Sequence, residues 1–280
     1  MKPILQKRIL KIQEGNLSLP TDQLAVEEPL EIQLAYWENQ QLEKVSLSIT
    51  MRTPGADESL ALGFLYAEGI IESMDEVAKI AHLPSWDADF SDNRIVVGLH
   101  QEVSPNLEKL RRHFYTNSSC GVCGKASIEA INLDQKANLP KGKPLFKPDI
   151  IQQLPDILRK QQAIFAHTGG IHAAALFNTQ GELLLLEEDV GRHNAVDKVI
   201  GMALQSDLFP LHDYLLQVSG RTSFELVQKA LMAEIPILSA VGAPSSLAVQ
   251  LAESADMTLL GFVKPTQFNI YSGSERIILD

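Results

Sequence analysis

The C-terminal half of the sequence alternates short apolar runs with amphipathic helical patterns, and this alternation limits the fold more than any other feature. The runs follow one another as helix 192–204, strand 214–218, helix 224–233, strand 235–241, helix 246–255 and strand 257–263. Strands joined by helices of this length are typical of a mostly parallel sheet with helices on its faces. The sequence therefore predicts an α/β domain on a mixed, mostly parallel sheet flanked by helices.

Three further patterns precede this alternation. Residues 148–162 predict a helix, and the apolar runs 172–177 and 182–187 predict a hairpin across a turn at 178–181. Nearer the N-terminus, strands at 31–36 and 45–50 are expected to form a hairpin. A helix at 60–67 and another strand at 94–99 are expected to follow it. We therefore predict a small α+β domain over 1–115 and the α/β domain over 116–280, so that the chain is α+β overall.

Charge and apolar content exclude several classes of protein. The chain has 24 lysine and arginine residues and 35 aspartate and glutamate residues, so its net charge is −11. This negative charge argues against non-specific binding to nucleic acid. An anionic ligand would therefore need a local basic patch. The N-terminus lacks the apolar region of a signal peptide, and no apolar run approaches the ~18 residues of a membrane span. Two cysteines cannot form a disulfide framework in so long a chain, so we expect a cytoplasmic protein without membrane contact.

The two cysteines, Cys120 and Cys123, stand two residues apart between glycines and serines. Such a pair can close a disulfide, supply half of a zinc site, or offer a nucleophile beside a second thiol. A helix is expected over 126–133, and its N-terminus and Lys125 would favour a thiolate. A pair of inert core cysteines is the alternative, but the polar surroundings favour a reactive sulfur.

Three expected strand-to-helix junctions carry glycine, serine and arginine, at 188–194, 218–225 and 241–246. Ligands of open α/β sheets usually bind at such ends of parallel strands. Arg192 and Arg221 are suited to an anion, and the candidate ligand residues at these junctions are Arg192, His193, Ser219, Gly220 and Arg221. Thr222 and Glu225 have the spacing of a capping box. Each junction alone could be only a good turn, but the three together favour a phosphate or nucleotide site.

Histidines gather in the same half of the chain. His167 and His172 flank a glycine pair, and His193 precedes Asp197 by one helical turn. Two of these histidines could complete a zinc site with the cysteines, but no spacing typical of a zinc finger is present. We therefore expect no permanently bound metal. The pair of His193 and Asp197 is either a surface hydrogen bond or a proton-exchanging group near a thiolate.

Several segments, in this order along the chain, resemble the FdhD/NarQ family. They are Arg52-Thr53-Pro54-Gly55, Ala61-Leu62-Gly63-Phe64, Ser118-Ser119-Cys120-Gly121-Val122-Cys123-Gly124-Lys125, Thr168-Gly169-Gly170-Ile171-His172-Ala173-Ala174, Glu188-Asp189-Val190-Gly191-Arg192-His193-Asn194-Ala195-Val196-Asp197-Lys198, Ser219-Gly220-Arg221-Thr222-Ser223-Phe224-Glu225 and Ala243-Pro244-Ser245-Ser246-Leu247-Ala248. The resemblance extends from about residue 50 to the C-terminus. It implies a larger domain similar to cytidine deaminases, a smaller N-terminal domain, and a homodimer.

The resemblance also implies a function. Members of the family are sulfur carriers needed for active formate dehydrogenase. Cys120 would accept sulfur from a cysteine desulfurase as a persulfide, with Cys123 assisting, and deliver it to the molybdenum of a bis-molybdopterin guanine dinucleotide cofactor. The family's cofactor-contacting segment corresponds here to Phe262, Val263, Lys264, Pro265, Thr266 and Gln267.

This sequence departs from the family at two places. Lys264-Pro265 stands where many relatives have Arg-Gly, and Ala56 stands where a histidine is expected. Lysine meets a phosphate as a point charge rather than as a fork, and proline lacks the backbone donor.

The first hypothesis is thus a cytoplasmic sulfurtransferase that serves formate dehydrogenase. A dithiol–disulfide oxidoreductase and a non-catalytic chaperone for the cofactor remain as alternatives. Hydrolytic deamination is excluded, because His-x-Glu combined with Pro-Cys-x-x-Cys is missing.

Overall fold

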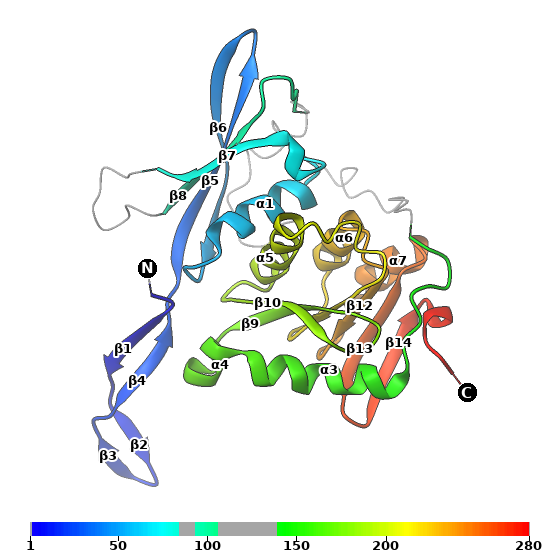
Figure 1. Ribbon diagram of the computed structural model, residues 1–280. Coiled ribbons are helices and arrows are strands. Elements are labelled where there is room, and N and C mark those ends of the chain that lie inside the picture. Colours follow the sequence, from blue (N-terminus) through cyan, green and yellow to red (C-terminus); the bar gives the residue numbers. More distant parts are fainter. Residues whose placement is uncertain (1, 84–92, 106–138, 280) are drawn as a thin grey trace.

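A computed structural model of the chain describes residues 2–83, 93–105 and 139–279 (Figure 1). The prediction of a reactive pair at Cys120 and Cys123 lies outside the described residues, and so does the helix expected over 126–133. Within the described ranges, no helix is long and apolar enough to cross a bilayer.

The C-terminal part is built on a six-stranded sheet with the order β10-β9-β11-β12-β13-β14. Its strands are β9 (His172–Phe177), β10 (Leu183–Asp189), β11 (Leu215–Val218), β12 (Ile237–Ala240), β13 (Thr258–Lys264) and β14 (Gln267–Ser272). The helices around it are α3 (Pro148–Gln161), α4 (Ala163–Thr168), α5 (Arg192–Gln205), α6 (Phe224–Met232) and α7 (Ser246–Ser254), and a 3₁₀ turn, η4 (Ser274–Arg276), lies near the C-terminus. These elements lie where the sequence predicts them, except β14 and the two short elements α4 and η4.

Alternation along the strands gives the sheet two apolar faces. On β9, Ala174 and Leu176 pack in the cluster that includes α5, α6 and α7, whereas Ala173, Ala175 and Phe177 pack with residues of α3. Successive strand residues point to opposite faces, so a run that is apolar throughout must be covered on both. The prediction of a sheet flanked by helices is therefore confirmed.

The expectation of a mostly parallel sheet is wrong. Only the pairs β11–β12 and β12–β13 are parallel, whereas β9–β10, β9–β11 and β13–β14 are antiparallel. Tight turns join β9 to β10 and β13 to β14, and such short connections permit only antiparallel pairing. The sheet is mixed, and the likeness to cytidine deaminases stays a prediction.

The N-terminal part carries a four-stranded sheet with the order β6-β5-β8-β7. Its elements are β5 (Glu28–Glu38), β6 (Gln41–Arg52), α1 (Asp57–Ala67), the 3₁₀ turn η1 (Met74–Glu76), β7 (Val77–His82) and β8 (Arg94–Leu99). The predicted hairpin is the antiparallel pair β5–β6. Two small ribbons extend away from the body of the molecule (Figure 1), formed by β1 (Ile4–Arg8) with β4 (Thr21–Ala25) and by β2 (Lys11–Gln13) with β3 (Asn16–Ser18).

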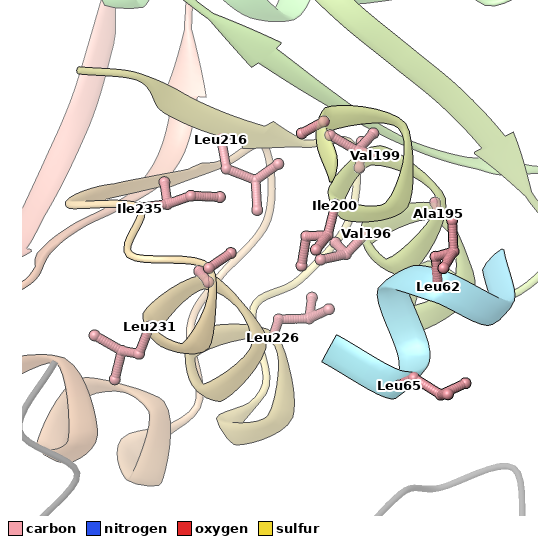
Figure 2. Packing of buried hydrophobic residues seen from close by; sticks show 14 of the residues in the cluster. Leu62, Leu65, Ala195, Val196, Val199, Ile200, Leu216, Leu226, Leu231 and Ile235 are labelled. Carbon is pink, nitrogen blue, oxygen red and sulfur yellow. The ribbon is translucent and has the colours of Figure 1, made fainter. Parts of the chain in front are cut away.

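Helices α1 and α5 join the two sheets through two glycines. A Cβ atom on Gly63 would overlap the carbonyl oxygen of Asp197, and one on Gly201 would overlap that of Ser59. The two backbones therefore touch, and larger residues would force the helices apart. Leu62 and Leu65 of α1 belong to the same buried cluster as residues of α5, α6 and β11 (Figure 2). Both sheets thus share one core, and a domain boundary at residue 115 stays a prediction.

Candidate functional site

The three predicted junctions, β10–α5, β11–α6 and β12–α7, meet at one edge of the mixed sheet. β11 and β12 are parallel, so their carboxyl ends lie at the same edge. Residues of all three junctions line a pocket of ≈ 280 Å³, which we call the junction pocket: Arg192, Arg221, Thr222, Ser223, Ala243, Pro244 and Ser245. The structure thus brings together residues that lie more than fifty positions apart in the sequence.

Backbone hydrogen bonds hold two of these junctions side by side. The Gly242 amide donates to the Gly220 carbonyl at 3.0 Å, and the Ser245 amide donates to the Thr222 carbonyl at 3.0 Å. A Cβ on Gly242 would lie 2.9 Å from the Gly220 oxygen. Glycine at this position therefore permits the close approach that forms one wall of the junction pocket.

The predicted capping box at the start of α6 is wrong. Ser223 is the N-cap and its side chain makes no capping hydrogen bond. The Thr222 side chain is 2% exposed, and its Oγ1 has no hydrogen-bond partner. A buried hydroxyl without a partner costs about 1–3 kcal/mol, so this group is poised for a ligand in the junction pocket.

Positive charge gathers at the same place. Arg192 is the first residue of α5, and Arg221 lies in the loop before α6. Neither guanidinium is hydrogen-bonded or ion-paired to another side chain within the described ranges. Two free guanidinium groups beside helix N-termini are suited to an anion such as a phosphate.

His193 pairs with α6 rather than with Asp197. Its Nε2 lies 3.2 Å from Ser223 Oγ and 3.7 Å from Glu225 Oε2. Burial by itself would raise the pKa of Glu225, but hydrogen bonds from His193 and Ser223 outweigh it and lower that pKa to about 2. Asp197 instead accepts two hydrogen bonds from buried Lys229, at 2.7 and 2.9 Å. The interpretation of His193 and Asp197 as a surface pair is therefore wrong.

The other histidines lie in different surroundings. His172 begins β9, and its Nδ1 would lie 3.3 Å from a Cβ placed on Gly220. Burial first, then the positive charge of Arg192 and His193, lowers the pKa of His172 below its ordinary value, so its imidazole is neutral at neutral pH. His167 is exposed in α4.

Ser219 and residues 262–267, which the sequence predicts as ligand contacts, differ in their surroundings at this edge of the sheet. Ser219 Oγ accepts a hydrogen bond from the Ala173 amide at 2.9 Å, which links β9 to the end of β11. Phe262 is 39% exposed in a bulge of β13, with φ 53, and its amide donates to the Gly242 carbonyl at 3.1 Å. Val263 is buried in the core, whereas the remaining residues of the segment are exposed: Lys264, Pro265, Thr266 and Gln267.

Much of the 188–198 motif binds the N-terminal sheet instead of the pocket. Lys198 Nζ lies 2.8 Å from Asp189 Oδ2 and donates to the Thr53 carbonyl at 3.0 Å. Asp189 also accepts hydrogen bonds from the amides of Thr53 and Gly191 and from the side chain of Asn194. These buried residues therefore fix the Arg-Thr-Pro-Gly loop against α5.

Sequence reasoning missed the orphan hydroxyl of Thr222 and the pairing of Asp197 with Lys229. No pattern in the sequence marks either, because the partners depend on how distant segments pack. Among the residues that the structure places, no group of three or more His, Cys, Asp or Glu side chains could hold a metal ion. Cys120 and Cys123 lie outside the described residues, so this statement does not extend to them.

Comparisons with known proteins give a consistent result. The sequence model of the FdhD/NarQ family matches residues 25–278. The chain is 46% identical over 278 residues to the sulfur carrier protein FdhD of Streptomyces avermitilis, covering 98% of this chain and 95% of that protein. It is 43% identical over 277 residues to the protein of the same name from Mycobacterium tuberculosis, covering 97% of each.

A solved structure has the same fold. The crystal structure of a Desulfotalea psychrophila protein assigned as a formate dehydrogenase accessory protein superposes with a TM-score of 0.74 at 24% identity. The match covers 99% of this chain and 100% of that one.

Proposed function

Because the chain belongs to the FdhD/NarQ family, we propose that it is a sulfurtransferase that delivers persulfide sulfur to the molybdenum cofactor of a formate dehydrogenase. Its curated relatives are sulfur carrier proteins by name. The substrate of the proposed reaction is a bis-molybdopterin guanine dinucleotide, and the sulfur donor is a cysteine desulfurase. We place the reaction in the cytoplasm and expect the chain to act as a homodimer.

Loading begins with the thiolate of Cys120. It attacks the terminal sulfur of the desulfurase persulfide, so that a new S–S bond forms on Cys120 while the donor's S–S bond breaks. The desulfurase cysteine leaves as a thiolate. No electrons are gained or lost overall, and the sulfur is carried as Cys120–S–S⁻.

Delivery uses the second thiol. Attack of Cys123 on the Cys120 sulfur forms a Cys120–Cys123 disulfide and releases the terminal sulfur as sulfide, the form in which it can bind molybdenum. The two electrons that reduce the sulfur come from the pair of cysteines. A thiol reductant then restores both thiols.

The junction pocket is the observation that carries the acceptor half of the proposal. A guanine dinucleotide presents phosphates, and a protein of net charge −11 needs a local site to hold them. Arg192 and Arg221 line the junction pocket together with the buried, unpartnered hydroxyl of Thr222. Phe262 is exposed, and its amide donates to the carbonyl of Gly242, which directly precedes Ala243 in the lining of the junction pocket.

The test is intact-protein mass spectrometry after incubation with a cysteine desulfurase and free cysteine. We expect one added sulfur that a reductant removes, and its loss in Cys120→Ala. Cys123→Ala is the matched control, because it should still load sulfur but fail to release it as sulfide.

Two outcomes would contradict the proposal. One is that no sulfur is added to the wild type while both thiols are free and the desulfurase is active. The other is that a Cys120→Ser/Cys123→Ser double variant fully activates formate dehydrogenase. The protein would then be a non-catalytic chaperone that uses the junction pocket without its thiols.

A further inference from the structure

The N-terminal arm, residues 4–25, is a long hairpin that takes no part in the junction pocket. β1 pairs with β4 and β2 pairs with β3 in one continuous register, and between the two ribbons the Ile9 amide donates to the Pro20 carbonyl at 3.0 Å. The hairpin turns at Glu14 and Gly15, where φ is 52 and 79. At about 3.3 Å per residue the arm is roughly 30 Å long, and it extends away from the body of the molecule (Figure 1).

The outer half of this arm has an apolar face that its own chain does not cover. Ile12 and Leu17 pair directly, and Leu10 and Leu19 lie two positions from them on the same strands, so all four side chains share one face. They are 68–74% exposed, and so is every residue of β2 and β3 classed as exposed. A two-stranded hairpin that packs against nothing is only marginally stable in water. The apolar face therefore indicates a protein surface that covers it.

The arm also differs in charge from the rest of the chain. Residues 2–25 contain four of the 24 lysine and arginine residues but only two of the 35 aspartate and glutamate residues. Their net charge is therefore +2, whereas that of the rest of the chain is −13. Surfaces of opposite charge attract one another and fix the register of a contact. In charge, the arm is thus complementary to the body of a second copy of this chain.

An apolar strip suited to receive the arm lies on β6, which is an edge strand of the N-terminal sheet. Ile49 and Met51 are 55% and 38% exposed, and they alternate with the half-buried Ser48 and Thr50, so they share one face of the strand. We call these two side chains the β6 strip. The exposed carboxylate of Glu27 lines the same cavity of ≈ 340 Å³ as both of them. The arm points away from β6 (Figure 1), so it does not cover the strip of its own chain.

We propose that the N-terminal arm of each protomer lies on the β6 strip of a second copy of this chain, so that two copies exchange arms. Each copy has one arm and one strip, so the reciprocal contact closes at two copies and covers both apolar surfaces. Each arm supplies the 22 residues 4–25, comparable with the roughly 20–30 residues on each side of a stable interface. That two copies associate rests on the proposed function, whereas the arm as the means of contact rests on these surfaces.

The experiment is sedimentation equilibrium of the full-length protein, which gives both the mass of the particle and its dissociation constant. We expect the wild type to have twice the chain mass of 30.9 kDa. The arm variant Ile12→Asp/Leu17→Asp should associate about 100-fold more weakly or worse, because it places charges where apolar side chains are buried. Leu145→Asp/Leu279→Asp is the matched control, since it changes two exposed apolar residues elsewhere and should associate as the wild type does.

Mixing two variants distinguishes exchanged arms from a protein that has merely failed to fold. The strip variant Ile49→Asp/Met51→Asp keeps its arm, and the arm variant keeps its strip, so each alone should be a monomer. An equimolar mixture should form dimers with one copy of each variant, because one of the two contacts is then intact. These mixed dimers should dissociate more readily than those of the wild type.

Three results would each overturn the proposal: a monomeric wild type, an arm variant that associates as the wild type does, or a mixture that stays monomeric. Sulfur loading measured on the same preparations is a separate readout. A protein that exchanges arms but accepts no sulfur would contradict only the proposed function. A protein that accepts sulfur but forms no contact through its arm would contradict only the arm exchange.

Discussion

The interface between the two sheets and the edge of the mixed sheet use the same stretch of chain, 188–198, but they treat polar groups differently. At the interface, Asp189 is paired with Lys198 and accepts three further hydrogen bonds. At the edge, Arg192 and Thr222 line the junction pocket, and the Thr222 hydroxyl has no hydrogen-bond partner. Buried polar groups whose hydrogen bonds are all made within the protein indicate a structural role. Buried polar groups that line a pocket without a hydrogen-bond partner indicate a ligand.

The largest effect is expected at the saturated interface. Lys198→Met removes the cation from a fully buried carboxylate, and breaking such a pair costs about 3–5 kcal/mol of the free energy of unfolding. We expect a loss near 3 kcal/mol, because Asp189 keeps its N–H donors, and urea unfolding measures it. Lys160→Met, at an exposed residue of α3, is the control and should change stability by less than about 0.5 kcal/mol. A loss below about 1 kcal/mol in Lys198→Met would mean that the interface does not depend on this pair.

At the edge of the mixed sheet, we expect a substitution to weaken ligand binding and to leave stability unchanged. Arg221→Ala should leave the unfolding free energy within about 0.5 kcal/mol of the wild type, because the exposed guanidinium bonds no described side chain. It should weaken the binding of pyrophosphate about tenfold or more, since a charge-assisted hydrogen bond contributes about 1.5–3 kcal/mol. Calorimetry measures the affinity, with Arg8→Ala in the N-terminal ribbon as the control. Equal affinity in both variants would remove Arg221 from the site.

The hydrogen-bonded pair of Glu225 and His193 is intermediate between these two cases. The folded-state pKa of Glu225, about 2, lies below its ordinary value of 4.5, so the carboxylate stabilises the fold above that ordinary value. The contribution is lost as the pH falls from 4.5 towards 2. Because the group is partly exposed, we expect the wild type to lose about 1 kcal/mol more than Glu225→Gln between neutral pH and pH ~3. Identical losses in the two proteins would show that the pair does not stabilise the fold.

The smallest change distinguishes a ligand-binding hydroxyl from a structural one. Thr222→Val replaces a buried hydroxyl that has no partner, so the free energy of unfolding should rise by about 0.5–1 kcal/mol. Pyrophosphate affinity should fall at the same time. A loss of stability instead would mean that Thr222 forms a hydrogen bond that supports the fold, and the contrast between interface and edge would weaken.

The sequence predicts the positions of most elements but not how all of them pair. The period of apolar residues places α5, α6 and α7, and the β5–β6 hairpin, within a few residues. The direction of β9 relative to β11, and the last strand, β14, were not predicted, because strand order depends on packing rather than on local pattern.

The candidate site was also predicted only in part, because local patterns mark its residues but packing decides their partners. The three junctions were predicted from glycine, serine and arginine alone, and membership in the FdhD/NarQ family is confirmed. The capping box failed because its spacing also allows Glu225 to bind His193, which lies on another helix. The unpartnered hydroxyl of Thr222 was missed, because its lack of a partner depends on how distant segments pack. The roles of Cys120, Cys123 and the 262–267 segment stay predictions.

The paired glycines between α1 and α5 also affect how the molecule can move. A contact made by side chains can slide as rotamers change, whereas the contact at Gly63 and Gly201 joins one main chain to another and has no such freedom. The two sheets should therefore behave as one rigid body during the proposed sulfur transfer. That body provides a fixed reference frame, so spectroscopic labels placed on its two sheets should keep a constant separation.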